Sequence, residues 1–462
     1  LDRRTLLRSG SRETRYVYRT TRSGEPDEIH LPSEDILFCT YEKHLGHRLT
    51  AMTDRARTVE CLFDYHPVLG QLQCAENTLG QHDIEYLPSG RVRAERFRFG
   101  THDKYATYAY TLLGLPATYT FVDGETSSLR YDEHRRLARV ENDTLEIEFA
   151  YDAFSRTRRI KTESTDGGRS MDMSLTYDDG GREIERVLVS WSGVATRTQT
   201  LAQTYWADGK LRTRTWLADE DSRTESYDYD IRGRLREYAC TGSHPPLDPW
   251  GLAIAGQRFT FDALDNMLTL ETTYADVNTL PRKSSFHYAP NDPTQLIRIE
   301  RVQGASEEIV PLEYDACGNL KYDDAQRRME YDAMGRLVRW TRGSAWQDYR
   351  YDPLDRVGAV GGSDPTRFRY YRGGQVAWES DGVTSSSFHT FGGACLAQST
   401  SDSVGTHTVL LGSDAQGSVV SEAGATLASP AYGVYGYRPE EAGSSDIAYA
   451  GELKERDELA DG

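Results

Sequence analysis

The chain has 462 residues, a formal net charge of −18 and a hydrophobic fraction of 38%, yet it contains 29 tyrosines. The negative net charge argues against sequence-independent binding to nucleic acid or to anionic lipid. No run approaches roughly 18 consecutive apolar residues, which excludes a membrane-spanning helix. Low hydrophobicity combined with 11% aromatic residues predicts a chain that folds but lacks the material for one thick core.

The first segment of the chain is rich in arginine. A solvated edge strand explains such a cluster, because charged side chains keep an exposed strand edge from pairing with another chain. The chain begins with Leu1, and no apolar run with a positive flank follows, so we find no secretion signal and expect a fragment of a longer protein. The basic residues of this segment are Arg3, Arg4, Arg8, Arg12, Arg15, Arg19 and Arg22.

A short phrase recurs along most of the chain. It consists of an aromatic residue, Asp, three variable residues, Arg and an apolar residue, often with Gly directly before the Arg. Successive copies start mostly about 20 to 30 residues apart, which indicates a repeat architecture with variable insertions. Clear copies begin at Tyr131, Tyr151, Tyr229, Tyr314, Tyr331 and Tyr351, and degenerate copies begin at Tyr86, Tyr110, Tyr177, Tyr205 and Phe261.

Each phrase predicts the corner of a β-hairpin. In the copy at Tyr331, Asp332 can accept backbone N–H groups at the first turn position, and Gly335 tolerates the positive φ of the bulge that follows a type I turn. The segments after the corners alternate between apolar and polar residues with a period of two, as strands do; Leu337 to Trp340 and Glu185 to Trp191 are examples.

Neighbouring hairpins place equivalent residues about 4.8 Å apart. This spacing predicts a ladder, in which each aromatic ring lies against the next ring or against an arginine guanidinium. The Asp and Arg of one phrase can also pair across the turn, although an exposed pair contributes only ~0–1 kcal/mol. We therefore expect the geometry of the turn to matter more than the charge pair.

The spacing of the phrases favours one kind of all-β architecture. A propeller blade needs about 40 to 45 residues, and a short-rung solenoid needs a strict hexapeptide or nonapeptide repeat, and neither fits. A long, curling, mostly antiparallel sheet of hairpins remains. Because its strands alternate and hydrophobicity is low, we expect a wall one sheet thick with at least one wet face. From Tyr370 onward the phrase fades and the sequence becomes rich in Gly and small residues.

Several stretches interrupt the repeat without resembling an interdomain linker. Thr241 to Gly256 is rich in Pro and Gly, Gly361 to Thr366 is a tight connector, and Ser399 to Gly405 is a polar turn region. The acidic tail from Glu452 to Leu459 can form one or two helical turns. Six cysteines lie far apart without a C-x-x-C pair, which predicts buried free thiols rather than a disulfide framework or a zinc site.

No motif indicates a catalytic, cofactor-binding or metal-binding residue, so we assign none. His44 and His47 have no further ligand near them in the sequence, which favours surface histidines. Asp178, Asp179 and Gly180 lack the later ligands of a calcium loop, which favours a turn.

Two pairs of adjacent carboxylates are candidates for acid/base groups. Asp323-Asp324 and Asp457-Glu458 are adjacent in sequence and would point to opposite faces of a strand, so we interpret both pairs as solvated turns. Asp414, before Gly417-Ser418, could serve an autoprotease, but a turn-forming Asp is the simpler interpretation.

The Tyr-Asp phrases resemble the YD repeats of the RHS (rearrangement hot spot) family. The C-terminal stretch resembles the start of the RHS-associated core domain. Asp414 to Val419 is similar to its Asp-x-x-Gly-Ser-Val element, Ala431 to Gly436 to its Tyr-x-x-x-Gly turn, and Ala448 to Glu452 to its aromatic-x-Gly-Glu segment. The resemblance spans about residues 80 to 462.

The resemblance implies an all-β fold, a spiralling antiparallel sheet of YD-repeat hairpins that forms part or all of a hollow RHS shell. It divides the chain into an N-terminal β segment of the shell (residues 1–80), the YD-repeat shell (81–369) and the start of the RHS-associated core domain (370–462). In the family an aspartyl autoprotease follows, and this chain stops before it. We therefore expect neither enzyme activity nor a cofactor within this chain.

The resemblance also implies a function. Bacterial RHS shells enclose a C-terminal toxin, as in Tc insecticidal toxins and in type VI secretion effectors, so we expect a secreted shell that encapsulates a toxic effector for delivery into target cells. Its expected partners are that toxin domain and a secretion spike protein, a chaperone or a Tc toxin B component. Teneurins use a related shell for adhesion, so a cell-surface adhesion or glycan-binding shell is the alternative, and an enzyme in its own right is a weaker third.

Overall fold

The computed structural model describes residues 4–19, 24–42, 47–362, 365–433, 436–437 and 445–447. Within these ranges the only regular structure is β-strand, arranged in two antiparallel sheets of 26 and 13 strands. No helix of the described residues is long and apolar enough to cross a membrane. The predicted all-β, antiparallel fold is confirmed.

The first sheet extends from β1 to β26. Its strands are β1 (Leu6–Ser9), β2 (Arg12–Val17), β3 (Glu28–His30), β4 (Ile36–Tyr41), β5 (Leu49–Asp54), β6 (Glu60–Tyr65), β7 (Leu72–Glu76), β8 (Gly80–Tyr86), β9 (Val92–Phe99), β10 (His102–Tyr110), β11 (Pro116–Thr120), β12 (Thr126–Tyr131), β13 (Leu137–Glu141), β14 (Leu145–Tyr151), β15 (Thr157–Ser164), β16 (Ser170–Tyr177), β17 (Glu183–Trp191), β18 (Thr196–Tyr205), β19 (Leu211–Ala218), β20 (Asp221–Tyr229), β21 (Leu235–Gly242), β22 (Ile254–Phe261), β23 (Met267–Tyr274), β24 (Arg282–Ala289), β25 (Asp292–Gln303) and β26 (Ser306–Pro311).

The second sheet extends from β27 to β39. Its strands are β27 (Glu313–Tyr314), β28 (Leu320–Tyr322), β29 (Arg328–Tyr331), β30 (Leu337–Arg342), β31 (Ala345–Tyr351), β32 (Val357–Gly362), β33 (Arg367–Arg372), β34 (Gln375–Ser380), β35 (Ser385–Phe391), β36 (Ala394–Ser401), β37 (Thr406–Ser413), β38 (Val419–Ala423) and β39 (Leu427–Ala428).

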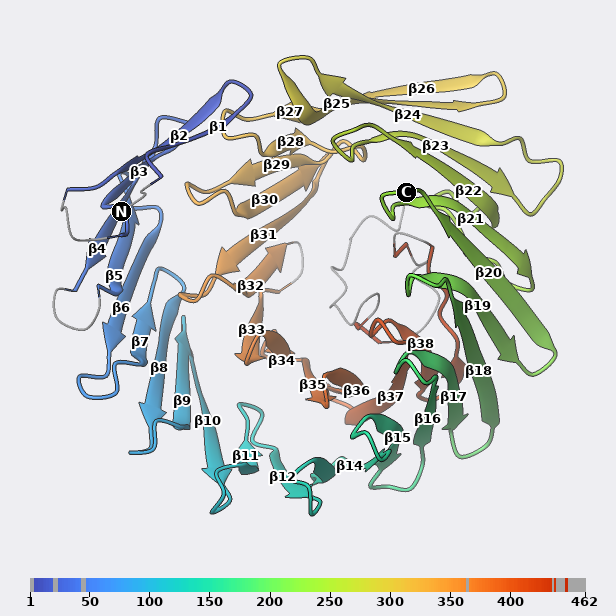
Figure 1. The fold of residues 1–462 in the computed structure, drawn as a ribbon. Helices are drawn as coiled ribbons and strands as arrows, with labels where there is room; N and C mark the ends of the chain where they lie inside the picture. The colour runs from blue at the N-terminus through green and yellow to red at the C-terminus, as the bar shows by residue number, and fades with distance from the viewer. Residues whose placement is uncertain are drawn as a thin grey trace.

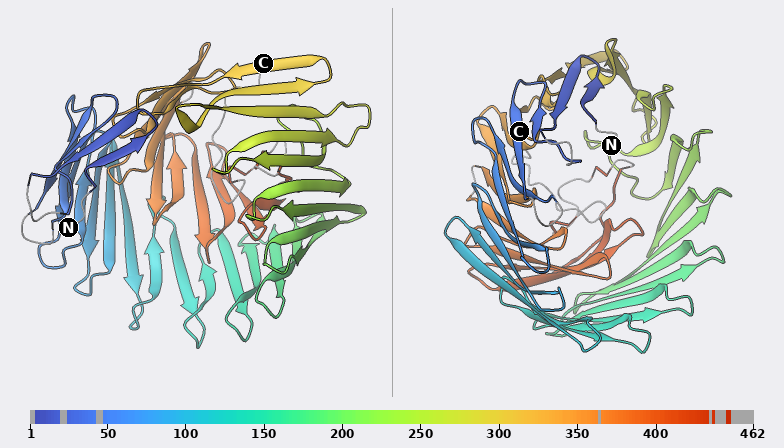
Figure 2. Two further views of the ribbon diagram at one scale, coloured as in Figure 1. Left: turned by 45° about the horizontal axis from the view of Figure 1, so that its top comes forward. Right: turned by 60° about the vertical axis from the view of Figure 1, so that its left-hand side comes forward.

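Both sheets are uninterrupted meanders, because within each sheet every strand pairs antiparallel with the next strand along the chain. The first sheet curls into a nearly closed ring, and the second sheet continues inside it as an inner turn (Figure 1). Figure 2 shows the same spiral from two other directions. The twist that accumulates from strand to strand curls a long open sheet in this way.

The two sheets pack face to face over part of the ring. Leu188 on β17 and Leu410 on β37 belong to one buried apolar cluster. In a second cluster, Phe97 on β9 meets Tyr370 on β33, with ring centroids 5.7 Å apart. The expectation of a wall one sheet thick is therefore wrong here, because the inner turn covers the apolar face of the outer turn and removes it from water.

Burial differs between the two turns in a way that explains the change in sequence after Tyr370. In β17, buried positions alternate with half-buried or exposed ones, since one face meets the second sheet and the other meets solvent. In β38 every position is buried. A strand covered on both faces favours apolar or small residues, and a charged residue such as Glu422 needs a hydrogen-bond donor there, so the Asp- and Arg-rich alternation of the outer turn fades.

The N-terminal strands lie beside the end of the first sheet and help to close the ring. As predicted, β1 is an edge strand, and it is exposed at every position. Arg12 on β2 is not a solvated residue, because its guanidinium pairs with the carboxylate of Asp292 at the start of β25. Arg3 and Arg22 lie outside the described residues.

The interruptions of the repeat are shorter than expected. Between Thr241 and Gly256, β21 continues to Gly242 and β22 begins at Ile254, so the connection spans residues 243–253. The turn predicted from Ser399 to Gly405 begins only at Asp402, because β36 continues through Ser401. The tail from residue 452 to residue 459 and part of the connector at 361–366 lie outside the described residues.

Candidate functional site: the corner ladder and the inner sheet

The corner between β29 and β30 has the predicted geometry. The N–H of Gly335 donates to the carbonyl of Asp332 (2.9 Å), and the N–H of Asp332 donates to the carbonyl of Arg336 (3.0 Å). Gly335 has a φ of 77°. The Asp332 carboxylate accepts hydrogen bonds from the N–H of Met334 (2.9 Å) and from Nε of Arg336 (2.7 Å). The assignments of Asp332 and Gly335 are confirmed.

Two corner aspartates, Asp178 and Asp230, are held in the charged form. Backbone and side-chain hydrogen bonds from Arg182 lower the pKa of Asp178, and a side-chain hydrogen bond from Arg234 lowers the pKa of Asp230. The two Asp178 oxygens accept from the backbone N–H of Arg182 (2.8 Å) and from its Nε (2.7 Å). The expected Asp–Arg pair is thus present, and it forms part of the turn itself.

The arginine of one corner lies over the aromatic ring of the next. The Cζ atom of Arg136 is 4.5 Å from the ring centroid of Tyr151. The Tyr151 hydroxyl donates to the carbonyl of Leu137 (2.8 Å), the first residue of the strand that follows the previous corner. Burial raises the pKa of the Tyr151 phenol. The predicted ladder is confirmed, with a hydroxyl bond in addition to the stacking.

The hydroxyl bond recurs around both turns of the spiral. In each case a tyrosine donates to the backbone of a neighbouring hairpin and so adds a side-chain link to the strand pairing. The donors of the described residues include Tyr65, Tyr86, Tyr110, Tyr151, Tyr177, Tyr205, Tyr288, Tyr314, Tyr351, Tyr371 and Tyr432.

One further copy of the phrase was missed as a corner. Between β28 and β29, the Asp323 carboxylate accepts from the N–H of Arg327 (2.8 Å) and from its Nε (2.6 Å). Gln326 takes the positive φ that Gly335 takes in the next corner. Asp323 therefore forms a turn, as predicted, but a buried one rather than a solvated one. The spacing Tyr322, Asp323, Arg327 was the signal available in the sequence.

Asp414 forms a corner of the same geometry between β37 and β38. Its N–H donates to the carbonyl of Ser418 (2.9 Å), and the N–H of Gly417 donates to its carbonyl (3.1 Å). The Tyr432 hydroxyl donates to the carbonyl of Val419 (2.7 Å), so the ladder continues even though Ser413 replaces the aromatic residue of the phrase. The turn-forming role predicted for Asp414 is confirmed.

Buried arginines of the outer turn hold this inner corner. Nη1 of Arg186 on β17 donates to the Asp414 carbonyl (3.1 Å), and Nη1 of Arg214 on β19 lies 3.3 Å from the Asp414 carboxylate. Arg186 is balanced by Glu183 (2.7 Å) and Arg214 by Glu225 (2.7 Å). Because each buried charge has a partner, the network joins the two turns without leaving an uncompensated ion.

Ser399, His389 and Glu125 lie between the two turns of the spiral, in the arrangement of a nucleophile, a base and an acid. Nε2 of His389 is 3.0 Å from Oγ of Ser399, and Nδ1 is 3.6 Å from Glu125. Burial lowers the pKa of His389 to about 4, so the ring is neutral at neutral pH. The cavity beside His389 and Glu125 has a volume of only about 20 Å³, too small for a substrate, so the cluster joins the two turns as a polar contact.

The remaining groups singled out in the sequence are scattered. His47 is exposed, Asp178 lies in the corner already described, and His44 and Asp457-Glu458 lie outside the described residues. The six cysteines are free thiols, as predicted, but only Cys61 and Cys240 are buried, and the other four are half-buried. Within the described part of the chain, no group of three or more His, Cys, Asp or Glu side chains is placed to hold a metal ion.

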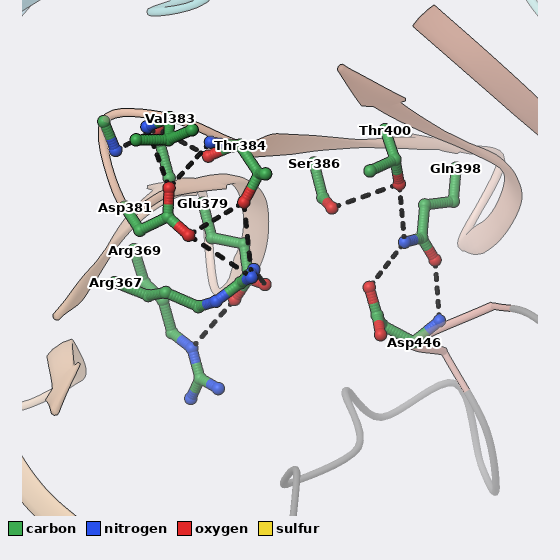
Figure 3. A network of polar contacts seen from close by, with 12 residues as sticks. Arg367, Arg369, Glu379, Asp381, Val383, Thr384, Ser386, Gln398, Thr400 and Asp446 are labelled. Carbon is green, nitrogen blue, oxygen red and sulfur yellow. Dashed lines mark hydrogen bonds and ion pairs between the residues drawn. The ribbon is translucent and has the colours of Figure 1, made fainter. Parts of the chain in front are cut away.

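The inner face of the second sheet, meaning the face turned away from the first sheet, carries a buried polar network (Figure 3). Glu379 on β34 pairs with Arg367 (3.1 Å) and Arg369 (3.4 Å). Farther along, the Gln398 amide bonds Asp446, from the C-terminal segment. The sequence contained no signal for this contact, because it joins isolated residues from segments far apart in the chain.

The sequence matches no family model, and no curated protein is similar to it in sequence. Solved structures do match. The TcdB2-TccC3-Cdc42 crystal structure has a TM-score of 0.63 and the TcdB2-TccC3 crystal structure one of 0.62, both at 13% identity and over 97% of this chain. The Photorhabdus luminescens Tc holotoxin pore matches with a TM-score of 0.60. This chain spans about a quarter of the length of the chains it matches, and it shares their all-β shell fold.

Proposed function

We propose that this chain is part of the shell of a bacterial RHS toxin, which encloses a C-terminal toxic effector for delivery into target cells. The observation that carries the proposal is the spiral itself. A meander of 26 strands curls into a ring, and the chain then turns inward instead of forming a separate domain. Such a ring places the continuation of the chain inside a wall, where a toxin would be kept from its producer.

The similarity in fold favours a Tc-type shell over the other RHS systems. The structures that match include Tc complexes that contain TcdB2 together with TccC3, and this chain is similar to a quarter of their length. We propose that the ring described here is one section of a larger enclosure, which a longer parent chain or a B-type component completes. A secreted protein follows from this function, and we assign no catalytic role to this section.

The corner ladder supports a role as a wall. Arginine stacking and tyrosine hydroxyl bonds connect each hairpin to the next, so the wall is held by side chains as well as by strand pairing. The stability of the wall is therefore shared among many small contacts. A thin wall without a thick core can remain intact in this way.

The test is protection of the downstream cargo. The complete parent reading frame is expressed, and the particle is imaged by electron microscopy and challenged with protease. We expect density inside the wall and a C-terminal domain that is resistant to protease in the intact particle but not after denaturation. A solid interior, or a C-terminal domain digested as fast in the particle as when free, would exclude encapsulation.

Adhesion or glycan binding is the second candidate. A cavity of about 570 Å³ lies over β19 to β23, beside the half-exposed ring of Trp206 and the charged side chains of Asp228 and Arg258. Aromatic rings next to polar groups are typical of carbohydrate sites. Binding to a glycan array that is lost in Trp206→Ala would support glycan binding. EGF-like cysteines and a membrane helix in the parent reading frame would support adhesion.

A further inference from the structure

Three consecutive residues of the C-terminal segment each have a separate partner on the inner face of the second sheet. The hydroxyl of Ser445 donates to the carboxylate of Glu422 on β38 (2.7 Å). Asp446 exchanges two hydrogen bonds with Gln398 on β36. Its N–H donates to Oε1 (2.7 Å), and its carboxylate accepts from Nε2 (2.6 Å). Figure 3 shows the pair.

The third contact is apolar. Ile447 is buried, with 5% of its surface exposed, in a cluster with Phe388, Leu411 and Val419. This cluster is separate from the one that joins the two sheets. The segment is therefore held by polar groups at two positions and by a hydrophobic contact at the third.

Strand register shows that the partners share one face. Ala397, Leu410 and Ala423 are paired in a row and pack against the first sheet. Gln398 and Leu411 follow them in sequence, and since successive strand residues point to opposite faces, they point inward. The segment thus occupies the side of the second sheet that faces the middle of the ring.

The chemistry of the partners is selective. The Gln398 amide offers an acceptor oxygen and an NH2 donor group, so it binds the backbone N–H and the carboxylate of Asp446 together. Glu422 is 1% exposed, and a buried carboxylate requires hydrogen-bond donors, which Ser445 provides. The site therefore accepts a peptide segment with a hydroxyl donor, a carboxylate and a branched apolar side chain in this order.

We propose that the inner face of β35 to β38 is a peptide-docking site, which binds the chain at Ser445–Ile447 and so anchors this segment to the wall. The inference rests on the proposed container function for its purpose. The docking itself does not depend on it. In a shell, such an anchor would hold the chain to the wall independently of the covalent connection on either side of it.

Hydrogen exchange of the full chain tests the docking site. In the unmodified protein, the Asp446 amide should exchange slowly, because it donates to Gln398. Gln398→Ala removes both hydrogen bonds and should speed exchange at residues 445–447 about fivefold or more. Gln257→Ala is the matched control, because it removes a glutamine whose amide bonds Thr272 in the first sheet, and it should leave that exchange unchanged.

A second variant keeps the test independent of folding of the sheet. Residue 446 lies outside every strand, and Asp446→Ala removes the carboxylate that accepts from Gln398 but keeps the backbone N–H that donates to it. Exchange at residues 445–447 should therefore become faster, by less than in Gln398→Ala. Exchange at the unprotected rate in the unmodified protein, or no response to either variant, would overturn the docking site. Failure of cargo protection with slow exchange at these residues would instead reject the container and leave the docking site in place.

Discussion

At the scale of single residues, the fifth position of the corner phrase is the one that requires a positive φ. Gly335 occupies it with a φ of 77°, and Ser155 occupies the same position of another corner with a φ of 64°. Only glycine adopts this region without a steric penalty from Cβ. The phrase thus places its glycine where the backbone requires it, and it tolerates strain where glycine is absent.

Substitutions at this position should act in opposite directions. Gly335→Ala should lower the free energy of unfolding by about 1–2 kcal/mol, because a Cβ atom there has space but the backbone does not suit it. Ser155→Gly should raise it by a few tenths to about 1 kcal/mol. Urea unfolding measures both changes in free energy. Gly374→Ala is the control, because the φ of Gly374 is not positive. Equal effects at Gly335 and Gly374 would contradict the corner assignment.

The corner aspartate Asp178 makes the stability of the fold sensitive to acid. The folded-state pKa of Asp178 is lowered, so its contribution to stability is present above the unfolded value of about 3.9 and is lost as the pH falls below it. We expect Asp178→Asn to lower the thermal midpoint at pH 7 and the difference from the unmodified protein to shrink towards pH 3. Asp179→Asn removes the same charge from the next, exposed position and serves as the control.

A difference that stays constant from pH 7 to pH 3 would show that the charge of Asp178 does not stabilise the fold. Asparagine preserves an oxygen that can accept the backbone N–H groups, so the comparison isolates the charge from the turn. Thermal unfolding followed by circular dichroism over this pH range is sufficient.

At the scale of the strands, the outer and inner turns differ in how their two faces are buried. In β17 buried positions alternate with half-buried or exposed ones, whereas β38 is covered on both sides. The apolar faces meet in the cluster that includes Leu188 and Leu410. The inner turn therefore depends on the outer turn for the burial of its apolar side chains, and Arg186 and Arg214 of the outer turn bind its corner at Asp414.

Removal of one side chain from this contact should destabilise the protein strongly. Leu188 is 1% exposed, and Leu188→Ala should cost about 2–5 kcal/mol, because it leaves a cavity between the sheets. Leu217→Ala, on a strand of the same sheet but 47% exposed, should change stability by less than about 1 kcal/mol. Guanidinium unfolding measures the two values. Similar costs would contradict the packing of the two turns.

At the scale of the whole molecule, the ring is closed by a contact across almost the length of the first sheet. Arg12 and Asp292 are separated by 280 residues and pair through their side chains. No local pattern marks these two residues as partners. Their contact joins the first hairpin of the chain to the last part of the outer turn before the chain passes inward.

Arg12→Ala removes the ion pair with Asp292, and we expect it to destabilise the contact between the two ends of the first sheet without unfolding the sheet itself. Hydrogen exchange in β1 and β2 should become faster, while exchange in β14 to β19 should stay unchanged. The charge-reversed pair Arg12→Asp with Asp292→Arg should restore the slow exchange at least in part. Arg8→Ala, which breaks the exposed pair with Glu13, is the control and should have no such effect. Unchanged exchange in Arg12→Ala would show that the pair does not hold the ring closed.

Much of the candidate site could be predicted because its determinants are local. Asp332 and Gly335 lie within one turn, and the recurrence of Tyr and Arg predicted the stacking of successive corners. Asp414 was assigned as a turn residue for the same reason. Its place in the ladder was not foreseen, because Ser413 replaces the aromatic residue that marks the other corners. The docking of Asp446 on Gln398 could not be foreseen either, since neither residue belongs to a motif.

The sequence by itself determined the β-strands, the corners and the ladder, because each depends on residues that are close in the chain or repeated at a regular spacing. Only the tertiary structure decided that the sheet winds inward, that Leu188 meets Leu410, and that Arg12 closes the ring on Asp292. The physical reason is that strand twist and apolar burial act over the whole sheet. Small increments of twist add up over many strands, and the apolar faces that come together are separated by hundreds of residues.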